Sequence, residues 1–252
     1  YKDDLNMFVK LRSAVQLRFS DKIDYRQYES QIQKLINRHV ESGAVKTVTE
    51  LVNIFDTEAF EKEVEKITGT AAKADTIASR TSKFITENMD ADPVFYKKFS
   101  QLLKDTIAAY EQGRIDEQEY LKRVLKYKDD ILTHTDNELP KELQQNNAAK
   151  AYYGLALETY QRAFGDDVQI DLKRLALDTA RTFDTIINRK LIVDGCVLVD
   201  WQLKSDIIGR MKIELEDYLI DEVKRKYELA FSFDDMDTII DGCVDVAKLW
   251  IR

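Results

Sequence analysis

The residues able to do nucleophilic or metal chemistry are few and widely separated in this sequence. Its 252 residues include two histidines, His39 and His134, and two cysteines, Cys196 and Cys243. Zinc sites need ligands at convergent spacings such as H-E-x-x-H or C-x₂-C, and neither spacing occurs. Nucleophilic catalysis needs a histidine near a serine or cysteine and oriented by a third group. We therefore expect no catalytic residue and no metal site, and we expect both histidines to be partly exposed helix residues.

One stretch imitates a magnesium-dependent nuclease. Residues 166–173, DDVQIDLK, match clustered carboxylates followed by a lysine, the set that holds Mg²⁺ and polarises water in such enzymes. That arrangement needs adjacent β-strands, whereas Gly165 is typical of a helix end and Asp171 of the cap of a following helix. We therefore interpret Asp171 as a cap. A minimal nuclease at residues 166–173 is the alternative from the enzyme class.

Turn-forming residues are scarce, with only 8 glycines and 2 prolines, while 44% of the residues are apolar and 33% are charged. This composition excludes β-sandwiches and propellers and favours long helices joined by short connections. No glycines stand in the G-x-x-x-x-G-K-[ST] or G-x-G-x-x-G pattern, which excludes loops that cradle phosphates. The sequence predicts an all-α fold, a multi-helix bundle.

Apolar residues recur at helical spacing along almost the whole chain. Asp92 before Pro93, and Asp116 before Glu119, are typical helix starts. The exception is the stretch around Asp194-Gly195, where β-branched residues flank a strong hairpin signal near residues 190–200. Two opening helices are expected around residues 5–15 and 32–36. The further helices that we expect lie at about residues 45–55, 74–89, 93–113, 116–125, 152–165, 172–187, from 202 onward, and 234–250.

A polar stretch at residues 127–145, which contains Pro140, divides the helical pattern. We place a domain boundary there, between a helical domain at residues 1–135 and a second at residues 141–252. One short repeat spans this second domain, VDGCV at residues 193–197 and IDGCV at residues 240–244. Because the first copy lies in a predicted turn and the second in a helical stripe, we interpret the repeat as coincidence rather than as a paired thiol site.

The chain carries 38 basic and 46 acidic residues, a formal net charge of −8. Its longest apolar run, residues 196–199, is far shorter than a membrane span, and we see no signal peptide. Two distant cysteines are no disulfide framework, so the expected compartment is the cytoplasm. The chain opens on Tyr1 within a helical pattern, which we interpret as a piece of a longer protein.

Basic residues are locally enriched despite the acidic total. Such a cluster can neutralise DNA phosphates without reading bases, although a solvated helix face of mixed charge is the commoner explanation. Residues 214–245 are strongly acidic and favour a protein partner over DNA. The candidate DNA contacts are Arg18, Arg38, Arg80, Lys83, Lys97 and Lys98.

Several blocks are specific in combination, although each alone is an ordinary amphipathic helix. They are ADTIASRT at 74–81, ITENM at 85–89, DPVFYKKFS at 92–100, AYYGLAL at 151–157, and VDW at 199–201 followed by Lys204, Arg210 and Lys212. In this order they resemble the endonuclease (R) subunit of type I restriction enzymes, over most of residues 1–225. In two respects the chain departs from that pattern, since acidic residues follow Arg210 and Lys212 and the approach to VDW is longer.

The resemblance implies a chain end that is not itself an enzyme. The nuclease and the ATPase motor of such subunits, with their Mg²⁺ and ATP, would precede this region, so no cofactor is expected here. The region would support the motor and dock the subunit onto the methyltransferase and specificity subunits, with duplex DNA bound by the intact subunit and no membrane involved. Interface candidates are Trp201, Arg210 and Lys212, with a core anchor as the alternative for Trp201. The alternative function is a helical module that binds duplex DNA through a basic face.

Overall fold

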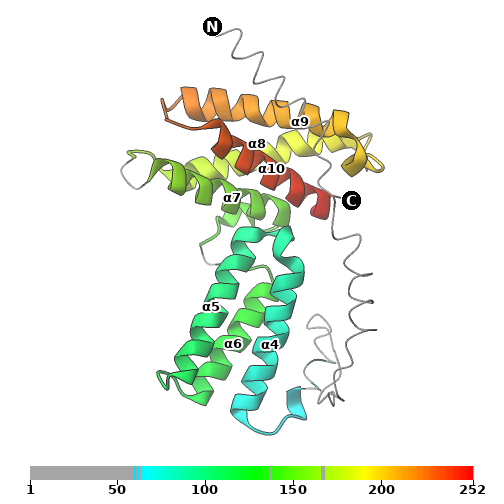
Figure 1. The fold of residues 1–252 in the computed structure, drawn as a ribbon. Coiled ribbons are helices and arrows are strands. Elements are labelled where there is room, and N and C mark those ends of the chain that lie inside the picture. The colour runs from blue at the N-terminus through cyan, green and yellow to red at the C-terminus, as the bar shows by residue number, and fades with distance from the viewer. Residues whose placement is uncertain (1–59, 61, 63, 137, 166–167, 252) are drawn as a thin grey trace, which may run out of the picture. The chain divides into compact units, whose positions relative to one another are not determined.

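The computed structural model describes residues 60, 62, 64–136, 138–165 and 168–251 (Figure 1). These residues belong to one compact unit, Val52–Arg252, while a separate unit, Tyr1–Leu51, lies outside the described residues. The helices expected before residue 56, together with Arg18, Arg38 and His39, therefore fall outside the description.

Three long helices make up the first part of the described chain, which we name the α4–α6 group. Asp92 caps α5 by accepting a hydrogen bond from the Phe95 amide at 3.1 Å, and Asp116 caps α6 by accepting one from the Glu119 amide at 2.8 Å. Both predicted helix starts are thus confirmed. The elements are α4 (Thr70–Asn88), the 3₁₀ turn η1 (Met89–Ala91), α5 (Pro93–Glu111) and α6 (Glu117–Leu132).

Helix α6 continues beyond the predicted end at residue 125, into the stretch that looks polar in the sequence. Its buried stripe runs on through Val124, Lys128 and Ile131. Lys128 is 5% exposed, and its Nζ lies 5.5 Å from the ring centre of Phe60 and pairs with the carboxylate of Asp129. A charged side chain is thus buried on this face of α6, over an aromatic ring, which a count of charges does not reveal.

The second part, which we name the α7–α10 group, contains four long helices and one hairpin. Its elements are the 3₁₀ turn η2 (Lys141–Leu143), α7 (Asn147–Phe164), α8 (Leu172–Leu191), β1 (Ile192–Val193), β2 (Cys196–Val197), the 3₁₀ turn η3 (Trp201–Leu203), α9 (Ser205–Tyr218), the π-helix η4 (Leu219–Arg225) and α10 (Phe233–Trp250). Helix α7 lies beside both α8 and α10, and α9 packs on α8 and α10 (Figure 1).

The hairpin forms where the sequence predicts it. Strands β1 and β2 pair antiparallel, with Ile192 opposite Val197 and Val193 opposite Cys196. The two turn residues, Asp194 and Gly195, both have positive φ, 52° and 78°. Positive φ at both central positions defines the turn type that matches the twist of paired strands. The two copies of the short repeat adopt different structures, since Cys196 is exposed in this hairpin and Cys243 is buried in α10.

Two hydrophobic clusters underlie the two helical groups. One joins α4, α5 and α6 and includes Phe60, and the other joins η2, α7, α8, η3, α9, η4 and α10. The predicted all-α fold with one short hairpin is confirmed. The exact domain limits, 1–135 and 141–252, stay a prediction. Among the described helices, none has both the length and the apolar character needed to cross a bilayer.

Candidate functional site

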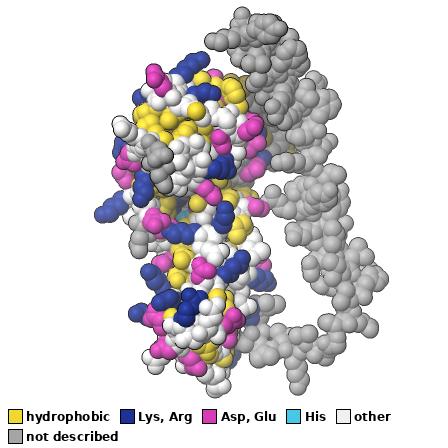
Figure 2. All heavy atoms as spheres, turned by 60° about the vertical axis from the view of Figure 1, so that its left-hand side comes forward, with side chains coloured by type: hydrophobic (Ala, Val, Ile, Leu, Met, Phe, Trp, Pro, Cys, Tyr) yellow, Lys and Arg dark blue, Asp and Glu magenta, His cyan; other side chains and the backbone are white. Residues whose placement is uncertain are grey.

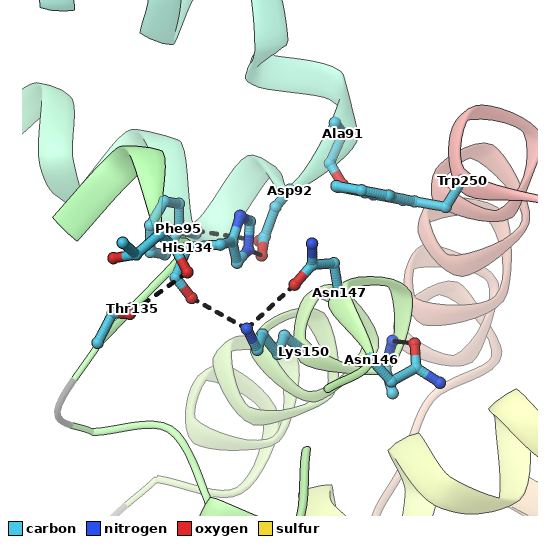
Figure 3. Close-up of polar contacts among 11 residues, drawn as sticks. Ala91, Asp92, Phe95, His134, Thr135, Asn146, Asn147, Lys150 and Trp250 are labelled. Carbon is cyan, nitrogen blue, oxygen red and sulfur yellow. Dashed lines mark hydrogen bonds and ion pairs between the residues drawn. The ribbon is translucent and has the colours of Figure 1, made fainter. Parts of the chain in front are cut away.

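Buried polar residues gather where the two helical groups meet, at the start of α5 (Figure 3). Asp92 is 2% exposed and uses both of its carboxylate oxygens. Its Oδ1 accepts the Phe95 amide, and its Oδ2 lies 3.0 Å from Nε2 of His134. The residue that caps α5 therefore also ties the loop after α6 to the same point.

His134 contradicts the expectation of a partly exposed helix residue. It follows the end of α6 with a φ of 47°, and it is 6% exposed. Its ring stacks on Phe95, with centres 4.2 Å apart and planes 12° apart. The partner carboxylate lies 42 positions earlier in the chain, so local sequence patterns cannot reveal the pair. The available signal was a histidine just past a helix end, because histidine is enriched in the left-handed region.

Lys150, in the first turn of α7, joins the same cluster and was also missed. Its Nζ donates to the carbonyl of His134 and to Oδ1 of Asn147, both at 3.0 Å. Burial lowers the pKa of the Lys150 ammonium, and the nearby Asp92 carboxylate opposes that shift. Two neutral acceptors thus hold a buried cation at the junction.

The C-terminal end of α10 closes this junction from the other side (Figure 3). The indole N–H of Trp250 donates to the carbonyl of Ala91 at 2.8 Å, and its ring lies edge-on to His134, with centres 6.1 Å apart. Close contact continues between α5 and α7, where a Cβ on Gly154 would lie 3.1 Å from Cβ of Val94. Helices from both groups are therefore fastened together by specific contacts.

A groove of about 530 Å³ opens beside this cluster, between α5 and α7. It is lined by apolar side chains and by both signs of charge, including Lys97 and Lys98 from the predicted DNA contacts. Lys97 pairs with Glu158 at 3.1 Å, and Lys98 pairs with Asp136 at 2.8 Å and with Glu138 at 2.5 Å. Although burial lowers it, the pKa of Lys98 is raised overall by these two carboxylates.

The other described DNA candidates, Arg80 and Lys83, lie one turn apart on α4 and do not line this groove. Lys83 lies 3.7 Å from Glu87 on the next turn. Figure 2 shows lysine and arginine side chains interspersed with aspartate and glutamate over the face that it draws. The structure therefore brings together two of the candidates, and it surrounds them with carboxylates.

Of the three interface candidates, Trp201 is fully buried and its indole N–H donates to the carbonyl of Ile251 at 3.0 Å. That is the core anchor considered as the alternative, so Trp201 cannot present its ring to a partner. Arg210 and Lys212 lie on α9, where they pair with Asp206 and Asp241.

The same region exposes apolar side chains that sequence reasoning did not single out. Leu203 is 85% exposed, Val199 75% and Ile213 58%, although each is of a type usually buried. The apolar periodicity of the sequence did not predict their exposure. Val199 follows the hairpin, Leu203 is the last residue of the 3₁₀ turn η3, and Ile213 lies on α9. We name these residues, together with Ile192 and Val193, the hairpin–α9 surface.

The nuclease-like stretch behaves as a helix cap in its described part. The side chain of Asp171 accepts the Arg174 amide at 3.0 Å at the start of α8, whereas residues 166 and 167 lie outside the described residues. Throughout the described part of the chain, no group of three or more histidine, cysteine or acidic side chains is placed to hold a metal ion.

Comparison with known proteins identifies the family. Residues 1–241 match the family described as type I restriction enzyme HindI endonuclease subunit-like, C-terminal. A Methanocaldococcus jannaschii protein assigned as a type I restriction enzyme MjaIXP endonuclease subunit is 22% identical over 248 residues, which cover 93% of this chain and 22% of that protein. The chain thus spans about a fifth of the length of this relative. No solved structure matches the present chain. The chain belongs to the C-terminal family of type I restriction endonuclease subunits.

Proposed function

We propose that this chain is a non-catalytic C-terminal part of the endonuclease subunit in a cytoplasmic type I restriction complex. It supports the DNA-translocating motor and docks the subunit onto the methyltransferase and specificity subunits. Duplex DNA, ATP and Mg²⁺ are handled by the rest of the intact subunit. Membership of the C-terminal family supports the placement at the end of such a subunit.

The hairpin–α9 surface is the observation that carries the docking role. A side chain such as Leu203, 85% exposed, adds stability only when something covers it. Five large apolar side chains are exposed between residues 192 and 213, and exposed apolar surface is typical of protein interfaces. Charged residues at its border, Arg210 and Lys212, suit the polar rim that surrounds an interface centre.

The buried polar cluster supports a structural role for the junction. Asp92, His134 and Lys150 bind one another or neighbouring backbone and amide groups. Groups held in this way fix the position of α7 relative to α5, which suits a region that transmits force between a motor and an assembly surface.

The test is retention of the chain by the methyltransferase and specificity subunits. Leu203→Asp combined with Ile213→Asp should weaken the Kd about tenfold or more, because each carboxylate would have to be desolvated in the interface. Leu125→Asp is the control, since Leu125 is 37% exposed on α6, in the other helical group. Equal retention of both variants and of the unchanged chain would contradict docking through this surface.

The alternative function, duplex DNA binding through a basic face, has weaker support. Lys83, Lys97 and Lys98 all lie in ion pairs with carboxylates, which reduces their attraction for phosphates. A gel shift at two salt concentrations separates the two functions. A phosphate-binding face gives a steep loss of affinity with salt, whereas the docking function requires no shift from this chain alone.

A further inference from the structure

The groove between α5 and α7 has the size and lining of a small-molecule site. Its volume of about 530 Å³ lies within the range of roughly 300–1,000 Å³ that is usual for such pockets. Such sites combine apolar walls with a few polar groups that fix the ligand's orientation. Here the apolar part of the lining comes from Val94, Phe95, Leu139, Tyr153 and Leu157.

The carboxylates of this groove already have cationic or N–H partners. The lining contains as many carboxylates as lysines, so the formal charge of the groove is balanced. Lys97 and Lys98 form ion pairs with the three carboxylates at the rim. The Asp92 carboxylate accepts the Phe95 amide and pairs with His134. The carboxylates are those of Asp92, Asp136, Glu138 and Glu158.

Lys150 differs from the rim lysines because its charge has no carboxylate at hydrogen-bond distance among the described residues. It is 6% exposed, and it lines the groove. An ammonium has three N–H groups, and those bonded to His134 and Asn147 account for two of them. A buried cation is stabilised by an anion, and no acceptor for the third N–H is given by the described residues.

We propose that this groove binds a small organic anion, whose carboxylate or phosphate accepts a hydrogen bond from Lys150 and whose apolar body packs against Phe95, Tyr153 and Leu157. Lys173, which is exposed and has no ion pair among the described residues, adds a second positive charge at the lining. This inference concerns a ligand of the junction, and it is independent of docking through the hairpin–α9 surface.

Backbone amide NMR spectra of the 252-residue chain, titrated with hexanoate and with hexyl phosphate, provide the test. Both probes should shift amides of α5 and α7 around Val94 and Tyr153, and the tighter of the two identifies the preferred anionic group. Acetate, inorganic phosphate and hexanol each lack one half of the ligand and should shift these amides at least tenfold more weakly. Absence of shifts with both hexanoate and hexyl phosphate up to tens of millimolar would overturn the proposal.

Two variants test the assignment to Lys150. Lys150→Met keeps the length of the side chain and removes its charge, and it should weaken the binding of the tighter probe about tenfold or more. Lys104→Met, at an exposed position of α5 outside the groove, should bind as the unchanged chain does. If Lys150→Met alters the fold, as seen by circular dichroism, Leu157→Glu replaces it and should also weaken binding, because it places a like charge beside the anion. Unchanged affinity in the folded variant would refute the role of Lys150.

Discussion

The two helical groups solve the problem of burying apolar surface in different ways. The α7–α10 group encloses large side chains completely, among them Trp201, Tyr160 and Phe183, all at 0% exposure. The α4–α6 group has a smaller cluster and places the ammonium of Lys128 over the ring of Phe60. Yet the α7–α10 group, which has the larger core, also exposes more apolar side chains, such as Val199 and Leu203.

This contrast separates stability from recognition. Val199 and Leu203 are not part of the core of the α7–α10 group, so the proposed docking would cover side chains that the core does not use. The α4–α6 group is attached to α7 and α10 through the carbonyls of His134 and Ala91, which accept hydrogen bonds from Lys150 and Trp250. We therefore expect core substitutions to affect mainly the second group, and junction substitutions to affect the coupling of the two.

The largest effect is expected from Trp201→Ala, which empties the centre of the α7–α10 core. Deleting a buried tryptophan usually costs about 3–5 kcal/mol of unfolding free energy. Trp250→Ala is the comparison, because Trp250 is 39% exposed and its loss should cost less, about 2 kcal/mol, from the partly buried ring and its hydrogen bond to Ala91. Guanidinium unfolding measures both losses, and similar values would contradict the proposed difference between core and junction.

Asp92→Ala should cost about 2–3 kcal/mol, because it removes a helix cap and also leaves buried His134 without its partner. Asp116→Ala removes a comparable cap from an exposed position and should cost about 1 kcal/mol. Urea unfolding of both variants gives the difference between them. If the two losses are equal, the pair between Asp92 and His134 adds nothing to the stability of the chain.

Gly154→Ala should destabilise the chain by about 1 kcal/mol net, because the new methyl would meet Cβ of Val94 at 3.1 Å, a Cβ cannot rotate away, and the gain in helix propensity only partly offsets this overpacking. Gly242→Ala meets Cδ1 and Cδ2 of Leu155, at 3.1 and 3.3 Å, which are the flexible end of a side chain, so the gain of about 1 kcal/mol in helix propensity should offset the contact. Thermal unfolding distinguishes them. A stabilised Gly154→Ala would show that α5 can move away from α7 without loss.

The smallest effect appears only at alkaline pH. Burial raises the pKa of the Tyr160 hydroxyl, and the hydrogen bond with Thr179 only partly offsets this. The hydroxyl stays protonated in the folded chain while the unfolded chain ionises near pH 10, so its contribution is complete below pH 10 and is lost above it. Above pH 10 the free energy of unfolding should decrease with pH in the unchanged chain. In Tyr160→Phe this decrease should be less steep, by about 1.4 kcal/mol per pH unit. Tyr227→Phe, at a position 38% exposed, is the control, and equal slopes in both variants would contradict the burial argument.

Local signals in the sequence predicted most of the fold. The caps at Asp92, Asp116 and Asp171 and the turn at Asp194-Gly195 are each decided by neighbours a few positions away, and all four have the expected structure. Helical periodicity likewise placed α10 within one residue of its start.

The candidate site was harder to predict because its contacts join distant positions. His134 meets Asp92 across 42 positions, and Trp250 meets Ala91 across 159. Lysines are mostly exposed in folded proteins, whereas Lys128 and Lys150 are 5% and 6% exposed here, which only the folded chain shows. The exposure of Leu203 escaped prediction for the opposite reason, because apolar residues are expected to be buried.

The unequal burial of the two cysteines makes this chain a natural carrier of one spectroscopic label. Cys243 is enclosed in α10, and burial raises its pKa well above the usual value, so its thiolate is scarce and out of reach. Cys196 stands exposed in the hairpin, three positions before Val199. A maleimide dye should therefore attach at Cys196 alone, without any engineering. The fluorescence emission of the dye would then report in real time whether a partner subunit has bound near the hairpin.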